Sequence, residues 1–210
     1  FIGVGMYCVS LPVHHGITSG WVHLGLVVAV CAVLGAITGL ISLRTHGIGF
    51  IMITLAFAQM GYFIVISLKQ YGGDDGMSIA AASDFGWMQL NQPRTVYFTA
   101  WVLLMLLCGW IWRLRVSPFG MILRAGRQNA RRIASVGFPL RRYQLLAYVI
   151  SAVICGIAGM LSANLNAYAS PGAMSWFISG DMLVMVVLGG VGTVFGPFLG
   201  ALTFLGLEEV

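Results

Sequence analysis

Residues 21–43 read WVHLGLVVAVCAVLGAITGLISL, a run that contains no Asp, Glu, Lys or Arg. Twelve of its residues are Val, Leu or Ile. Each of these contributes about −0.3 to −0.6 kcal/mol to membrane insertion, so the run gains on the order of −5 kcal/mol before polar costs. At about 1.5 Å per residue it is long enough to cross a bilayer. The stretch therefore predicts a transmembrane helix.

The same test finds further apolar runs on the C-terminal side of this one, at 48–68, 96–112, 143–163 and 181–207, whereas residues 1–12 look like the end of an earlier helix. The chain is 59% hydrophobic and only 8% charged, which leaves too few charges to cover a soluble core. The unbroken runs exclude β-barrel alternation. We predict an all-α polytopic transmembrane helix bundle, with about five spans plus part of another. Both ends read as cuts in a longer protein.

The last run, 181–207, is expected to be a broken span. Its middle is crowded with helix-breaking residues, Gly189, Gly190, Gly192, Gly196 and Pro197. Two interpretations stay open at this point. The glycines either allow close helix packing or mark irregular backbone beside a transport path.

Residues 113–142 cannot lie in the membrane. They carry eight arginines, which would cost on the order of 20 kcal/mol at mid-bilayer. The positive-inside rule then places 113–142 in the cytoplasm. Successive loops must then lie on alternating sides of the membrane. This arrangement puts nine of the eleven cationic residues inside, and Lys69 and Arg94 outside. The four aspartates, at positions 74, 75, 84 and 181, fall outside or at the outer edge.

Within this basic loop, residues 117–137 are expected to form a helix, split at Gly126 if it is split at all. Ser117 suits the N-cap, Pro118 the first turn and Gly137 the position after the last turn. One face of this helix is apolar and a second is cationic; the apolar face holds Phe119, Ile122, Gly126, Ala130 and Ile133, and the cationic face holds Arg124, Arg127 and Arg131. Such a helix either lies on anionic lipid headgroups or inserts into a groove of a cytoplasmic protein.

Several classes of function are excluded by what the sequence lacks. The four cysteines and four histidines form no metal-binding spacing, so no metal site is expected. The only lysine, Lys69, follows Leu68, so no phosphate-binding loop is possible. The spans offer no acid–base pair, so neither an enzyme nor a cofactor is predicted. Because the charge is confined to a loop beside the membrane, nucleic acid is not expected as a partner.

Three stretches resemble the permease subunit of the branched-chain amino acid ABC importers. They are GIGFIMITLAFAQM (47–60) with GGDDGM (72–77), the long stretch 117–161, and AYASP (167–171) with MLVMVVLGGVGTVFGPFLGA (182–201). The resemblance runs in order over essentially the whole chain. It implies one permease domain over residues 1–210, truncated at both ends, in a bacterial plasma (inner) membrane, importing branched-chain amino acids by alternating access.

The resemblance also implies partners. The family's coupling helix, which docks on a separate ATP-binding subunit, falls on residues 117–137. Its expected docking residues are Arg124, Gly126, Arg127, Asn129, Arg131 and Gly137. The chain departs from the family pattern at Gln128 and Ala130, where acids are usual. A second related permease subunit and an extracytoplasmic substrate-binding protein are further implied, and the acidic outer loop 69–95 is a candidate contact for the latter.

Residues that line the transport path are harder to predict. Polar or glycine positions within the spans are the candidates: Thr54, Gln59, Gly189, Gly190, Gly192 and Thr193. Bonding between helices is an equally good explanation for their polar groups. Two alternative functions remain open, a related importer for urea or short amides and an ion-coupled secondary transporter.

Overall fold

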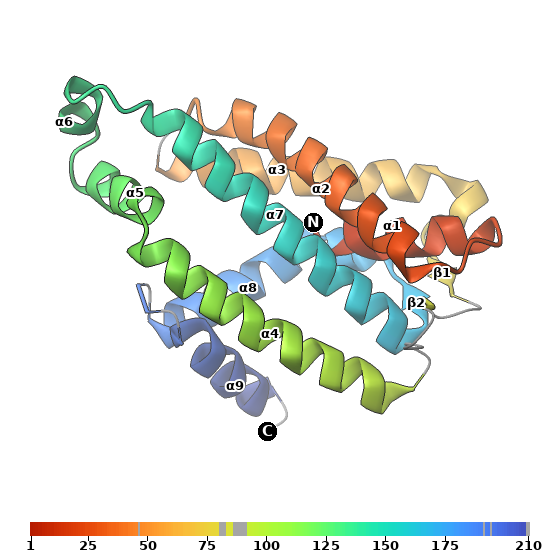
Figure 1. Cartoon of the computed structure of the whole chain (residues 1–210). Helices are drawn as coiled ribbons and strands as arrows, with labels where there is room; N and C mark the ends of the chain where they lie inside the picture. Colours follow the sequence, from red (N-terminus) through yellow and green to blue (C-terminus); the bar gives the residue numbers. More distant parts are fainter. Residues whose placement is uncertain (46, 80–82, 86–91, 191, 194, 209–210) are drawn as a thin grey trace.

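A computed structural model describes residues 1–45, 47–79, 83–85, 92–190, 192–193 and 195–208. Its helices are α1 (Ile2–His14), α2 (Gly20–Ser42), α3 (Ile48–Ser67), α4 (Pro93–Val116), α5 (Pro118–Gln128), α6 (Ala130–Ser135), α7 (Leu140–Asn166), α8 (Trp176–Gly189) and α9 (Gly196–Glu208). Two short strands, β1 (Met77–Ser78) and β2 (Tyr168–Ala169), pair antiparallel, and two 3₁₀ turns are η1 (Lys69–Tyr71) and η2 (Pro171–Met174). The predicted all-α bundle is confirmed (Figure 1).

Four helices of the described chain are long and apolar enough to cross a membrane, namely α2, α3, α4 and α7. They coincide with the first four complete apolar runs of the sequence. The helices α4 and α7 extend beyond the predicted 96–112 and 143–163 at both ends. Polar and basic residues continue a helix into the interface, where a hydropathy criterion no longer detects it.

The run 181–207 is broken as predicted, but it is not one kinked span. Its two halves, α8 and α9, pack against each other (Figure 1). A methyl group on Gly189 would overlap the carbonyl oxygen of Gly196, and one on Gly200 would overlap that of Met185. Two backbones this close tolerate only glycine at the contact. Each half is shorter than the roughly 20 residues that a span needs.

The depth of α8 follows from the contact between α1 and η2, the turn that precedes α8. Segments 18–20 and 84 pair at one end of the bundle, with Gly20 N–H donating to the Asp84 carbonyl at 2.6 Å. Helix α1 descends from that end. A methyl group on Gly3 would overlap Met174, so η2 lies roughly 16 Å, eleven residues of helix, below the end of α1. Asp181 in α8 therefore lies well below the end of α1 and not at the outer edge, as the sequence suggested, and its side chain is exposed.

The loops separate into two groups at opposite ends of the bundle, as the alternation of spans requires. One end gathers segments 18–20, 77–79 and 167–169, joined by the β1–β2 pair and by the bond from Ile79 N–H to the Ala167 carbonyl (2.8 Å). The other end carries α5 and α6 (Figure 1). The basic loop and the acidic loop thus lie on opposite sides.

The core lies where α1, α2 and α7 meet. Val9, Cys31 and Met160 are among its buried side chains. A methyl group on Gly159 of α7 would overlap the Ile2 carbonyl oxygen in α1. Because bilayer lipid is as apolar as these side chains, close van der Waals packing of this kind provides much of the force that holds such helices together.

A buried polar network ties α2 and α7 to the loop between α3 and α4. The His23 Nδ1 atom lies 2.8 Å from the Ser83 hydroxyl, and its Nε2 lies 3.0 Å from the Ile17 carbonyl. Since a carbonyl only accepts, Nε2 carries the proton and Nδ1 accepts from Ser83 when the imidazole is neutral. Ser83 N–H in turn donates to Asn164 Oδ1 at 2.8 Å. The only sign of this network in the sequence was that His23 and Asn164 are polar residues within apolar helices.

Asn164→Ala is expected to destabilise the fold by about 1–3 kcal/mol, because the Ser83 N–H would be left buried and unpaired. Asn166→Ala is the matched control, since Asn166 lies on the same helix but is exposed, and its loss should change stability by less than about 0.5 kcal/mol. Thermal unfolding of the purified permease complex measures both. Equal melting temperatures for the two variants would contradict the role given to the network.

Candidate functional site

The basic segment projects from one end of the bundle as two short helices rather than one (Figure 1). The predicted helix 117–137 splits at Asn129, not at Gly126. Asn129 has an extended backbone (φ −153°, ψ 96°), which ends α5. Its Oδ1 accepts from the Arg132 N–H at 3.1 Å, three residues on, which is the geometry of an N-cap for α6. Asn129 is therefore a joint between the two helices.

Replacing the joint residue tests this role. Asn129→Ala should destabilise α6 by about 1 kcal/mol, which corresponds to roughly fivefold faster amide hydrogen exchange over 130–135. Asn129→Asp keeps a side-chain oxygen at the cap and should exchange close to the parent rate. Hydrogen exchange of the assembled complex compares the two variants. If both exchange at the parent rate, the cap does not hold α6.

The bend between α4 and α5 is fixed by hydrogen bonds. Ser117 stands at the predicted N-cap position, and Pro118 opens α5 as expected. The Ser117 hydroxyl does not cap α5, however, but donates back to the Leu114 carbonyl at 2.6 Å. From α5, Arg124 Nη2 donates to the Arg115 carbonyl at 2.8 Å and its Nε to Gly120 at 3.4 Å. A cation on the last carbonyls of a helix is favourable there, so Arg124 braces α5 against α4.

The apolar face of α5 is partly used within the chain. The Phe119 and Tyr143 rings are 5.9 Å apart, which joins α5 to α7. A methyl group on Gly126 would overlap the Leu140 side chain. The small size of Gly126 thus allows α5 to approach α7, which is an intramolecular reason for this glycine. Helix α5 is therefore in contact with both α4 and α7.

The exposed surface that remains is cationic and polar. Arg127, Asn129 and Arg131 are exposed, as are Gln128 and Ala130 between them. Gly137 follows α6 with φ +91°, the left-handed backbone that a glycine tolerates, so its predicted place after the last turn is confirmed. Of the six predicted docking residues, only Gly126 is partly buried, against α7; the other five are exposed, although Arg124 is also bonded to α4.

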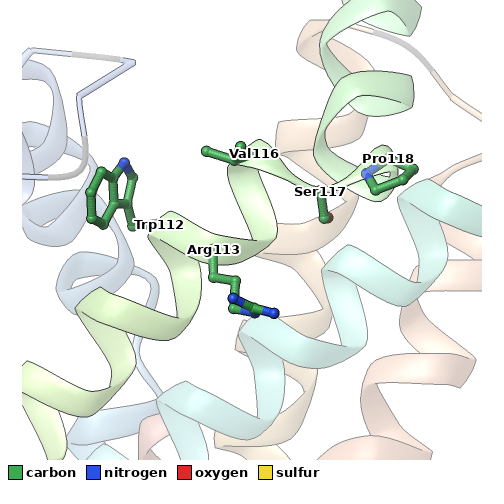
Figure 2. A pocket seen from close by; sticks show the side chains of 5 residues that line it. All are labelled: Trp112, Arg113, Val116, Ser117 and Pro118. Atoms are coloured by element: carbon green, nitrogen blue, oxygen red, sulfur yellow. The ribbon is translucent and has the colours of Figure 1, made fainter.

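An apolar groove of about 550 Å³ lies at the α4–α5 bend, lined by Trp112, Arg113, Val116, Ser117 and Pro118 (Figure 2). Trp112 and Val116 are 66% and 65% exposed, so this chain leaves the groove open. In Figure 2 Arg113 points toward α7 and Trp112 points away from it. A tryptophan and an arginine at the end of a span are typical of the membrane interface.

The predicted path residues do not form one cluster. Thr54 donates to the carbonyls of Phe50 and Ile51 within its own helix. Gln59 is half-buried, and its Oε1 is enclosed without a hydrogen-bond partner among the described residues. Helix α3, which carries both, contacts α8. No described hydrogen bond links either residue to the α8–α9 turn.

The glycine positions meet in the turn between α8 and α9. Gly189 ends α8, and Gly190 and Gly192 have φ of +94° and +120°. The space beside these last two is open. Thr193 Oγ1 donates to the Gly190 carbonyl at 3.4 Å, which closes the turn. The packing interpretation from the sequence therefore holds at Gly189. The space beside Gly190 and Gly192 is open, and a transport path there stays a prediction.

The fold and these surfaces define a class: a multi-pass membrane protein of apolar helices with a basic helical pair at one end. The whole chain, residues 1–210, matches the family described as "Branched-chain amino acid transport system / permease component". The chain belongs to this family, and its members are membrane subunits of transporters, not enzymes. No solved structure matches it.

Curated relatives agree with the family. The chain is 27% identical over 234 residues to the "high-affinity branched-chain amino acid transport system permease protein LivM" of Escherichia coli (strain K12), covering 100% of this chain and 55% of that protein. The LivM of Salmonella typhimurium gives the same identity and coverage. An "autoinducer 2 import system permease protein LsrC" from Photorhabdus laumondii is 28% identical over 106 residues, 48% of this chain and 32% of that protein. The chain spans about half the length of the LivM relatives.

Proposed function

We propose that this chain is the permease subunit of an ATP-binding-cassette importer that moves branched-chain amino acids inward. The observation that carries the proposal is the basic helix pair α5–α6. Helix α5 contacts both α4 and α7, and the pair also has an exposed cationic surface. A helix that is fixed to two spans transmits motion to both. Family membership and the LivM relatives support the cargo.

In this mechanism no covalent chemistry takes place on the chain. A cytoplasmic ATP-binding subunit docks on residues 117–137, with Arg127, Asn129 and Arg131 at the contact. When ATP closes that subunit, α5 moves and α4 and α7 move with it. Access to the cargo then alternates between the two sides, with ATP biasing two states that are each separately stable.

The remaining partners are assigned by side. Residues 113–142 face the cytoplasm of a bacterium, and the chain lies in its inner membrane. The opposite end, where Asp74 and Asp75 are exposed beside the β1–β2 pair, meets the extracytoplasmic substrate-binding protein. A second related permease subunit completes the path. Membrane lipid occupies the groove at the α4–α5 bend, because a lipid-facing tryptophan and an interfacial arginine suit it (Figure 2).

Transport by the reconstituted importer tests the proposal. Vesicles that contain the full permease pair, the ATP-binding subunit and the binding protein should accumulate leucine when ATP is supplied. Urea should not compete for this uptake. Uptake of urea without uptake of leucine would show that the cargo is urea or a short amide and not a branched-chain amino acid. Uptake that persists without ATP but requires a proton gradient would replace the importer by an ion-coupled transporter.

A further inference from the structure

Asp181 is a carboxylate at membrane depth on an apolar helix. The turn η2, which contacts the first turn of α1 roughly 16 Å below the end of α1, leads directly into α8, and Asp181 lies in the second turn of α8. Its neighbours along α8 are apolar, and its own side chain is exposed in this chain. A carboxylate facing lipid tails at this depth costs about 2.5–3.5 kcal/mol or more. Asp181 must therefore face something polar.

Among the residues that the structure describes, the helices that pack on α8 do not provide the opposite charge. Helix α8 packs on α9 and also contacts α3, and neither of these helices contains a Lys, Arg or His. Among the described residues Asp181 forms no ion pair or hydrogen bond. The arginines of the chain lie near the two ends of the bundle. The group that balances Asp181 therefore lies outside the described residues.

The position of Asp181 on α8 indicates which side of the helix is polar. Asp181, Met185 and Gly189 follow one another at intervals of four residues, so they share one face. That face meets α9 at Met185 and Gly189 and leads to the turn at Gly190. The open backbone of this turn cannot face lipid either, because lipid offers no hydrogen-bond partners. Helix α9 covers this face at Met185 and Gly189, so Asp181 and the open turn at Gly190 are the parts of it that remain to meet water or protein.

We infer that Asp181 lines the path of the cargo and binds its ammonium group during passage. The inference rests on the proposed function, which supplies a zwitterionic amino acid as cargo. An ammonium group matches a lone carboxylate, since it donates up to three charge-assisted hydrogen bonds. A carboxylate without a resident cation also leaves the bound cargo free to leave, as a transport path requires.

The first experiment asks whether position 181 meets water. In the complete importer with its native cysteines replaced, including the four of this chain, Asp181→Cys is compared with Leu183→Cys. Leu183 is also exposed in this chain but lies about 200° around the helix. A charged, membrane-impermeant thiol reagent should modify position 181 at least about tenfold faster, because only a hydrated thiol ionises and reacts. Leucine should slow the reaction. Equal rates, or no reaction in any nucleotide state, would overturn the inference.

The second experiment asks what the carboxylate binds. Asp181→Asn should lower ATP-driven leucine uptake by about tenfold or more, as expected for the loss of a charged hydrogen bond, whereas Asp181→Glu should keep most of it. Co-purification of all subunits must remain intact. Loss of the second permease subunit in Asp181→Asn would show that a protein cation pairs with Asp181, and would overturn the cargo site.

The outcomes separate this inference from the proposed function. If the parent importer takes up no leucine with ATP, the proposed function fails and the inference fails with it. If the parent takes up leucine and Asp181→Asn does so equally well, only the inference fails.

Discussion

Reversing two charges, Arg127→Glu together with Arg131→Glu, is expected to reduce the ATP-binding subunit that co-purifies with the permease by at least about tenfold. Both side chains are exposed on the segment that is proposed to dock. A cationic docking surface calls for acidic groups on the partner, and placing acids opposite such groups costs several kcal/mol, which corresponds to a loss of association of this size or larger. ATP-driven uptake should fall in parallel, since the helical pair would no longer receive motion from the partner.

A matched control is available at the opposite end of the bundle. Lys69→Glu with Arg94→Glu makes the same change in net charge at two exposed residues. This control should leave the ATP-binding subunit attached. Arg127→Lys with Arg131→Lys keeps the charge and should retain most of the association. If both charge-reversed permeases retain the same amount of the ATP-binding subunit, residues 117–137 are not the docking surface.

Gly159→Ala is expected to destabilise the fold strongly. Its added methyl group would overlap the backbone carbonyl of Ile2, so α1 must shift away from α7 and cannot simply change a rotamer. Overpacking of this kind costs about 1–3 kcal/mol or more. The shift would also disturb Gly5, which approaches the backbone of Gly156 along the same contact. Thermal unfolding of the complex in detergent measures the loss.

Gly25→Ala provides the comparison for this prediction. Gly25 lies on α2 with no atom within 4 Å of the position that its methyl group would take. Alanine there should be neutral or slightly stabilising, because it restricts the unfolded backbone without a clash. The two substitutions are chemically identical and should differ in sign. A melting temperature for Gly159→Ala at or above that of Gly25→Ala would contradict the packing described for α1 and α7.

In residues 117–137, the sequence correctly predicted those features that depend only on local backbone preferences. Pro118 at the first turn and Gly137 after the last are local backbone preferences, and both were placed correctly. The break at Asn129 was missed, because a hydrogen bond from the Arg132 N–H decides it and glycine was the more obvious candidate. The inward roles of Arg124 and Gly126 were also missed, since they depend on α4 and α7.

The sequence alone determined the membrane class, the four long spans and the separation of basic and acidic loops, because hydropathy and charge add along the chain without reference to contacts. Only the tertiary structure decided that 181–207 folds back as a hairpin and that Asp181 lies deep beside it. Both depend on how close two backbones come, as Gly189 comes to Gly196 and Gly3 to Met174. Such distances depend on how the helices pack, and hydropathy does not determine them.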